Sequence, residues 1–200
     1  MKISKSITVV TLAFTLALGT TAFAQDGSMK KMKKEKMMIQ TKMVGGAEMY
    51  PTKNIIENAV NSKDHTTLVA AVKAAGLVET LQGEGPFTVF APTNAAFDKL
   101  PKGTVETLLK PENKEKLQAV LTYHVVAGKV SSMDLVKMIK DGKGKAELTT
   151  VNGGKLTAML KGKKVQLKDA AGNISTVTIA DVNQSNGIIH VVDTVVLPGM

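Results

Sequence analysis

The chain of 200 residues contains no cysteine, no tryptophan and no arginine. Without cysteine it can form neither disulfide bonds nor thiolate metal sites, so a packed core must supply its stability. All 26 basic residues are lysines, and only 4% of the residues are aromatic. Because arginine and aromatic side chains are the usual means of reading bases and phosphates, we expect no nucleic-acid partner.

Long apolar runs are also missing. The apolar run near the N-terminus, Ile7 to Leu18, is shorter than the roughly 20 residues that a membrane-spanning helix needs. It follows Lys2 and Lys5 and precedes Ala22-Phe23-Ala24, a small-residue cleavage site of the A-x-A type. We therefore expect a signal peptide over residues 1–24 that is cleaved after Ala24. The expected protein is secreted or periplasmic and has no transmembrane anchor.

The charge balance is strongly basic, with 26 lysines against 17 acidic residues and a net charge of +9. An excess of lysine permits loose, salt-sensitive attraction to anionic polysaccharides or other anionic polymers. It is equally typical of a surface that only maintains solubility.

Residues 25–50 are dominated by methionine and lysine, have no sustained period and are interrupted by Gly45-Gly46. A flexible linker is the first interpretation. A second is capture of Cu(I) by thioether sulfurs at Met29 and Met32, although the neighbouring lysines repel a cation. A third is a strip with lysine heads and methionine bodies that rests on an anionic membrane.

Residues 51–200 have the pattern of one folded domain. Helical spacing predicts helices that begin at Thr52, at Thr66 or Thr67, near Asn94, at Thr104, at Pro111 and at Ser131 or Ser132, with Gly76 ending the second. Apolar runs predict strands over Phe87–Ala91, Leu148–Val151, Leu156–Leu160, Val165–Leu167, Ile174–Ala180 and Ile188–Leu197, most of them separated by glycine-containing turns. Helices that precede strands in this way indicate an α+β domain.

Catalytic patterns are missing from the sequence. It has no H-E-x-x-H, no G-x-S-x-G, no glycine-rich phosphate loop and no cluster of carboxylates. The three histidines lie in different contexts without a neighbouring ligand at metal spacing, so we expect no enzyme, no metal site and no cofactor. His65, next to Asp64 at a helix start, is expected to be exposed and incidental.

Three segments carry a resemblance to a known family: GPFTVFAPTNAAFDKLP at Gly85 to Pro101, LTYHVVAGKV at Leu121 to Val130, and SNGIIHVVDTVVLPG at Ser185 to Gly199. Their order and spacing resemble the fasciclin domain over about residues 51–199. The resemblance implies a wedge-shaped β-sandwich with several helices packed on one side. It directs attention to motif residues with an adhesion or structural role: Thr93, Asn94, Tyr123, His124, Asn186, His190 and Asp193. The residue types alone predict that Thr93 caps the next helix and that Asn94 bonds back to its own turn.

The resemblance also implies a function. Fasciclin domains are adhesion modules, and their Tyr-His pair is held to be both structural and part of a contact surface. We expect an exported, non-enzymatic module that binds a surface polysaccharide or an envelope or matrix protein weakly, and self-association stays open. The alternative is a periplasmic binding protein for a small apolar ligand or a soft metal, and a hydrolase comes third.

Overall fold

The structure is a computed structural model that describes residues 41–199. The expected signal peptide and the first part of the expected linker lie outside the described residues. The helices are α2 (Ile55–Ala59), α3 (Thr66–Ala75), α4 (Val78–Gln82), α5 (Asn94–Phe97), α6 (Thr104–Leu108), α7 (Lys114–Tyr123) and α8 (Ser132–Asp141), with 3-10 turns η1 (Lys63–His65) and η2 (Pro111–Asn113). Within residues 41–199, no helix has both the length and the apolar character needed to cross a bilayer.

The strands form a hairpin and one large sheet. The hairpin pairs β1 (Lys42–Val44) with β2 (Ala47–Met49). The sheet has seven strands in the order β4-β3-β9-β8-β7-β6-β5, with bounds β3 (Phe87–Pro92), β4 (Val125–Ala127), β5 (Lys145–Thr149), β6 (Lys155–Lys161), β7 (Lys164–Lys168), β8 (Ile174–Gln184) and β9 (Gly187–Val192). Neighbours are antiparallel except β3 and β9, which run parallel and place Phe90 opposite His190. This combination of helices and a large sheet confirms the α+β prediction.

The sheet bends back on itself through its long strand β8. The first residues of β8 pair with β7, its later residues pair with β9, and the register shifts on either side of Ile179. Such bulges bend a strand and increase its twist. The two outer strands of the sheet then approach each other, because Val126 bridges to Thr150 and the Val151 amide donates to the Val125 carbonyl at 2.8 Å. The two halves of the sheet therefore enclose a space that side chains fill.

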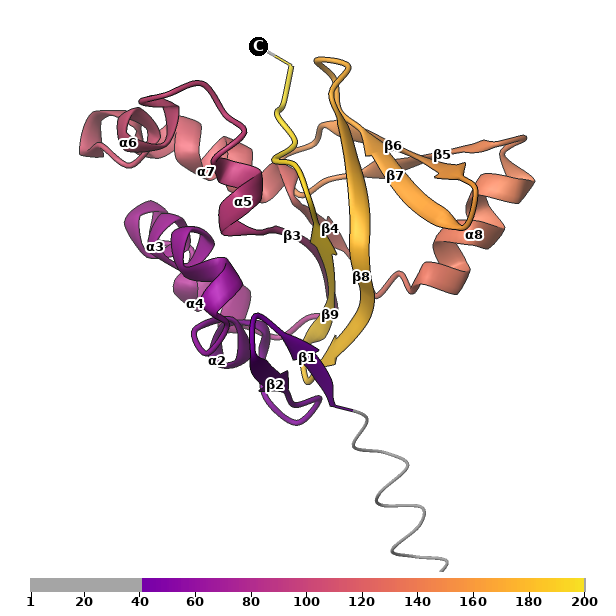
Figure 1. Cartoon of the computed structure of the whole chain (residues 1–200), viewed down its shortest axis with the longest axis horizontal. Helices are drawn as coiled ribbons and strands as arrows, with labels where there is room; N and C mark the ends of the chain where they lie inside the picture. The colour runs from indigo at the N-terminus through magenta and orange to yellow at the C-terminus, as the bar shows by residue number, and fades with distance from the viewer. Residues whose placement is uncertain (1–40, 200) are drawn as a thin grey trace, which may run out of the picture. The chain divides into compact units, whose positions relative to one another are not determined.

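The core has two parts. One lies between the helices α2–α7 and the strands β3, β8 and β9, and it contains Val72, Phe97, Leu121 and Ile189. The other lies within the bent sheet and beneath α8, and it contains Phe90, Tyr123 and several leucines. Figure 1 shows α2–α7 on one side of β3 and β9, and α8 with β5–β7 on the other. Because β3 and β9 carry core residues on both faces, their apolar runs are nearly continuous.

Local sequence explains several helix ends. Gly76 ends α3 with φ of 72°, as predicted, because a left-handed residue satisfies the last carbonyls of a helix. Ser131 caps α8 in a capping box with Asp134. The first helix differs from the prediction, since its cap is Asn54 in a capping box with Glu57, and Thr52 lies outside it.

The expected linker is wrong for residues 41–50, which form the hairpin β1–β2. Val44 and Met49 are only 4% and 3% exposed and belong to the helical core. The turn at Gly45 (φ 58°) packs directly on η1, where its carbonyl accepts from the Lys63 amide at 3.1 Å. Strands of three residues are too short to show a period in the sequence, and the hairpin is stable only through this packing.

Candidate functional site

Tyr123 and His124 end helix α7 inside the protein. Tyr123 as a whole residue is 0% exposed. Its hydroxyl donates to the Lys155 carbonyl at 2.6 Å and accepts from the Ala170 amide at 3.1 Å. Position 123 thereby joins α7 to β6 and to the turn that follows β7. Its aromatic ring is part of the core, so it can touch no partner in the folded state.

His124 has a defined tautomer because of its two hydrogen bonds. Its Nε2 accepts from the Val196 amide at 3.1 Å, so the proton must be on Nδ1, which donates to the Val120 carbonyl at 2.7 Å. The side chain is 2% exposed. Burial lowers the pKa of His124 from 6.5 to about 4, against smaller opposing effects of the Val120 carbonyl and of Asp169. The imidazole is thus neutral at physiological pH and holds the segment after β9.

Asp169 completes this group and was missed at the sequence level. Its carboxylate accepts from the Asn173 amide at 2.7 Å and from the Leu197 amide at 2.9 Å, and it is buried. The D-A-A-G-N sequence indicates an Asp-based turn, but nothing local shows that Oδ2, which also accepts from Asn173 Nδ2 at 2.9 Å, reaches the Leu197 amide. Asp169 and His124 therefore fix two successive amides of the C-terminal segment.

Thr93 and Asn94 cap two different helices. Thr93 caps α5 by accepting from the Ala96 amide at 3.3 Å, as predicted. The sequence suggested that the Asn94 side chain bonds back to its own turn, and this is wrong. Its Oδ1 accepts from the Thr67 amide at 3.0 Å, which is in the first turn of α3, and its Nδ2 donates to the Lys63 carbonyl at 2.8 Å. Helix α3 lacks a side-chain cap of its own, so Asn94 supplies one from 27 residues away.

Asn186 has a similar role at α2 and α4. Its Oδ1 accepts from the Ile55 amide at 3.1 Å, and its Nδ2 donates to the carbonyls of Leu81 and Gly83 at 2.8 and 3.0 Å. One amide side chain thus joins the turn before β9 to the start of one helix and the end of another.

His190 lies at the centre of the sheet, 0% exposed and stacked on Phe90 with 5.6 Å between ring centroids. Its Nδ1 accepts from the Asp181 amide at 3.3 Å, so Nε2 carries the proton and donates to the Val130 carbonyl at 2.9 Å. Burial lowers the pKa of His190, and the Val130 carbonyl and Asp181 oppose part of that shift. The ring is a hydrogen-bonded core residue that ties β9 to the segment before α8.

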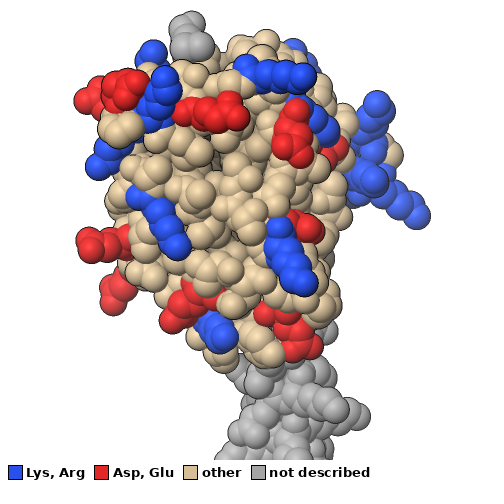
Figure 2. Space-filling view, turned by 60° about the vertical axis from the view of Figure 1, so that its left-hand side comes forward, with Lys and Arg blue, Asp and Glu red and all other residues tan. Residues whose placement is uncertain are grey.

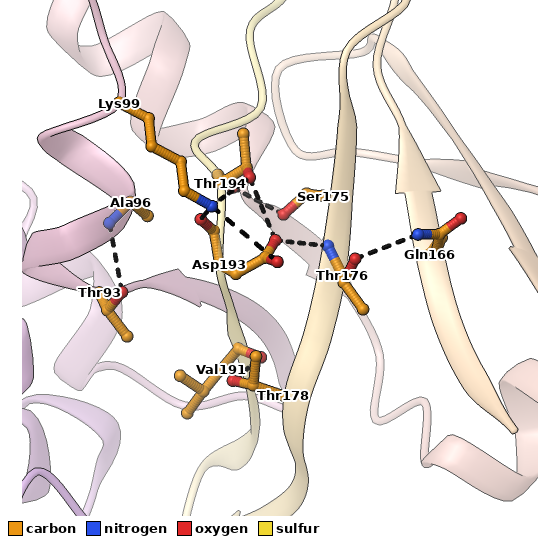
Figure 3. Close-up of polar contacts among 10 residues, drawn as sticks. All are labelled: Thr93, Ala96, Lys99, Gln166, Ser175, Thr176, Thr178, Val191, Asp193 and Thr194. Carbon is orange, nitrogen blue, oxygen red and sulfur yellow. Dashed lines mark hydrogen bonds and ion pairs between the residues drawn. The ribbon is translucent and has the colours of Figure 1, made fainter. Parts of the chain in front are cut away.

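Asp193 follows β9 and connects three elements (Figure 3). Its Oδ1 accepts from the Thr176 amide of β8 at 2.8 Å, and its carbonyl accepts from Lys99 Nζ at 2.5 Å. Ser175 donates to the Thr194 carbonyl at 2.7 Å from the same strand. Asp193 is partly exposed and lies outside the strand, whereas His190 is buried within it. The Asp193 carboxylate therefore binds the start of the C-terminal segment to strand β8.

His65 was expected to be exposed, and this is wrong. It is 3% exposed, its Nδ1 lies 2.8 Å from Ser62 Oγ, and no described residue bonds its Nε2. Burial lowers the pKa of His65, and the Ala91 carbonyl and Asp64 oppose part of that shift. The hairpin β1–β2, which the sequence did not reveal, covers this part of the molecule.

An apolar cavity of about 40 Å³ lies beside His65, between the hairpin, α2, α3 and β3. Its walls include Val44, Met49, Leu68 and Val89. The space suits a few water-sized molecules, whereas pockets for drug-sized ligands occupy roughly 300–1,000 Å³. It therefore gives little support to the alternative of a carrier for a small apolar ligand.

The seven motif residues do not converge on one site. The structure distributes them over helix caps, the sheet centre and the C-terminal segment, and hydrogen bonds within the fold engage each of them. Among residues 41–199 there is also no group of three His, Cys, Asp or Glu that could hold a metal ion. The arrangement can stabilise a fold, but it offers no constellation for proton transfer or nucleophilic attack.

Comparison with known proteins gives the class of protein. The fasciclin domain model matches residues 63–198. The chain is 45% identical over 187 residues to Protein sll1483 of Synechocystis sp., covering 94% of this chain and 92% of that one. It is 34% identical over 145 residues to the cell surface glycolipoprotein MPB83 of Mycobacterium bovis, covering 70% and 58%.

A solved structure agrees with this class at the level of the fold. A FAS1 domain pair from the insect cell adhesion molecule Fasciclin I matches with a TM-score of 0.65 at 18% identity, covering 72% of this chain and 51% of that one. The chain belongs to the fasciclin domain family.

Proposed function

We propose that this protein is an exported, non-enzymatic adhesion module that attaches to a cell surface or extracellular matrix. The observation that carries the proposal is the 34% identity, over 70% of this chain, to a cell surface glycolipoprotein. The signal-peptide pattern that ends at Ala24 supports export. The partner would be a surface polysaccharide or an envelope or matrix protein, bound at roughly micromolar affinity as in transient interfaces.

The state of His124 and His190 supports a non-enzymatic role. His124 and His190 each use both ring nitrogens in hydrogen bonds to the backbone, and burial holds the pKa of each below its ordinary value. A general base needs a free nitrogen within reach of a substrate. Neither ring has one, and we propose a structural role for both residues and for Tyr123.

The experiment compares attachment with turnover. The exported chain, fluorescently labelled, should bind saturably to intact cells of the organism that produces it or to their isolated envelopes, and excess unlabelled chain should displace it. No hydrolysis above buffer should occur on panels of esters, peptides and glycosides. Turnover that scales with protein concentration, or labelled chain that stays entirely in the supernatant, would overturn the proposal.

A further inference from the structure

The lysines of the described residues are concentrated in one part of the sequence. Residues 129–168 contain ten lysines against three acidic residues, which gives a net charge of +7. Residues 41–128 contain nine lysines and nine acidic residues, and residues 169–199 contain three aspartates and no lysine. The basic segment forms α8 and strands β5–β7, away from α2–α7 (Figure 1). Figure 2, in which the helical side comes forward, shows lysines and carboxylates interspersed there.

Strands β5–β7 direct five lysines to one face of the sheet. Exposed and buried residues alternate along them, as expected for strands with one solvated face. The inward side chains Leu148, Leu156 and Leu167 pack in the same core as α8. The outward, exposed lysines define what we call the lysine face: Lys145, Lys155, Lys161, Lys164 and Lys168.

The lysine face is electrostatically unfavourable by itself. Its one carboxylate, Glu147, forms an ion pair with Lys155 at 2.7 Å. Lys161 lies directly opposite Lys164 in the β6–β7 register, and Lys163 is in the turn between them. Like charges at facing positions of a sheet are destabilising. A bound anion would remove this repulsion, and such local conflicts with stability are typical of functional surfaces.

The uncharged residues of the lysine face indicate which class of anionic partner it could bind. Thr157 and Gln166 lie between the lysines in the register, on strands that are about 4.8 Å apart. Hydroxyl and amide groups suit the hydroxyls of sugar rings. None of the aromatic residues lies on β5–β7, so bases would have no stacking surface, and Met159, the central apolar side chain, is half-buried and cannot insert into a membrane.

We propose that the lysine face binds an acidic polysaccharide, through contacts of its lysines with carboxylate or sulfate groups and of Thr157 and Gln166 with sugar hydroxyls. This proposal rests on the proposed adhesive function and names the class of its partner. The rigid sheet holds the ammonium groups at fixed separations, so affinity depends on a regular spacing of charge along the polymer as well as on net charge.

The test compares two variants with the same change in charge. One replaces Lys145, Lys161, Lys164 and Lys168 with Gln. The control replaces four exposed lysines of the helical part, Lys102, Lys110, Lys114 and Lys116, with Gln. Both variants are otherwise identical to the wild-type chain, so the lysines that precede residue 41 contribute equally to each. Binding to polygalacturonate and to dextran sulfate is measured at 50 and 500 mM salt, with neutral dextran as the uncharged polymer and duplex DNA as the non-sugar polyanion.

We expect the wild-type chain and the control to bind the acidic polysaccharides alike, several-fold more weakly at high salt, and not to bind dextran. The lysine-face variant should bind at least tenfold more weakly at 50 mM salt and show a smaller salt dependence, because fewer counterions are released. Equal losses in the two variants, or tighter binding to DNA, would overturn the proposal. If the lysine-face variant still attaches to cells, adhesion stands and occurs through another surface.

Discussion

Gly154 packs so closely on Tyr123 that a Cβ atom added to the glycine would lie 2.7 Å from Cε2 of the tyrosine ring. The ring cannot move away, because its hydroxyl is held by two backbone groups and its faces are packed in the core. We expect Gly154→Ala to lower the free energy of unfolding by about 1–3 kcal/mol, as overpacking does. Urea denaturation measures it. The added cost should shrink in a Tyr123→Leu background, and equal costs in both backgrounds would show that the ring is not the obstacle.

His124 makes stability depend on pH. Its pKa is about 4 in the folded state and about 6.5 when unfolded, so the unfolded chain binds an extra proton between these values. The neutral ring thus stabilises fully above pH 6.5, and about 3 kcal/mol of that contribution is lost as pH falls to 4. Buried His65 and His190, whose pKa values are also lowered, act in the same direction.

Denaturant unfolding at pH 7.5 and pH 4.5 tests this dependence. His124→Gln should be less stable than the wild type at pH 7.5, because a buried partner loses its bond. Between pH 7.5 and pH 4.5, this variant should lose clearly less free energy of unfolding than the wild type does. Parallel pH profiles would contradict the assignment of the lowered pKa to His124.

At the scale of elements, the hairpin β1–β2 offers a matched pair of methionines. Met49 is 3% exposed and packs in the core, whereas Met43 on the neighbouring strand is 58% exposed. Met49→Ala should cost about 2–5 kcal/mol and Met43→Ala less than about 0.5 kcal/mol. Thermal unfolding of the two variants measures the difference. Equal, small effects would mean that the hairpin behaves as the linker that the sequence suggested.

Helix α3 depends on a residue that lies outside it. Asn94→Ala removes the acceptor of the Thr67 amide and the donor to the Lys63 carbonyl, so it should cost about 1–2 kcal/mol. Asn94→Asp keeps the acceptor and should lose less. Amide hydrogen exchange should increase at Thr67 and Leu68 in the Ala variant. Unchanged protection there would show that α3 does not need this cap.

Sequence patterns predicted the elements whose signals are local. The helix that ends at Gly76, the cap at Thr93 and the hairpins of the last third follow from capping residues, glycine turns and alternation. Strands β1, β2 and β4 were missed, because three residues are too few for a period and β4 follows α7 directly. The roles of Asn94, Asn186 and Asp169 depend on partners far away in the sequence, so no local pattern contains them.

At the scale of the whole molecule, the order of the strands could not be predicted from the sequence. Strand β9 lies between β3 and β8, and its parallel partner β3 is about a hundred residues earlier in the chain. Contacts at such separations have no signature in composition or spacing. The three motif segments indicated the kind of fold, a β-sandwich with helices on one side, but not this order of strands.

The central position of β9 leads to a prediction for truncation. A chain that ends before Gly187 loses the strand that joins β3 to β8, and both core parts lose residues. We expect no cooperative thermal transition for residues 1–186. Removal of residue 200 alone should leave the transition unchanged. A cooperative transition of the truncated chain would show that one half of the sheet folds independently.

The same parallel pairing determines when the molecule can become folded. Strand β3 is made early, but it must wait for β9, so the middle of the sheet stays open until roughly a hundred further residues have been synthesised. Pairings of such high contact order form slowly. A chain that is still being synthesised therefore lacks the completed sheet. Such a delay would suit the export proposed above, because a chain that has not yet folded can still be threaded through a membrane channel.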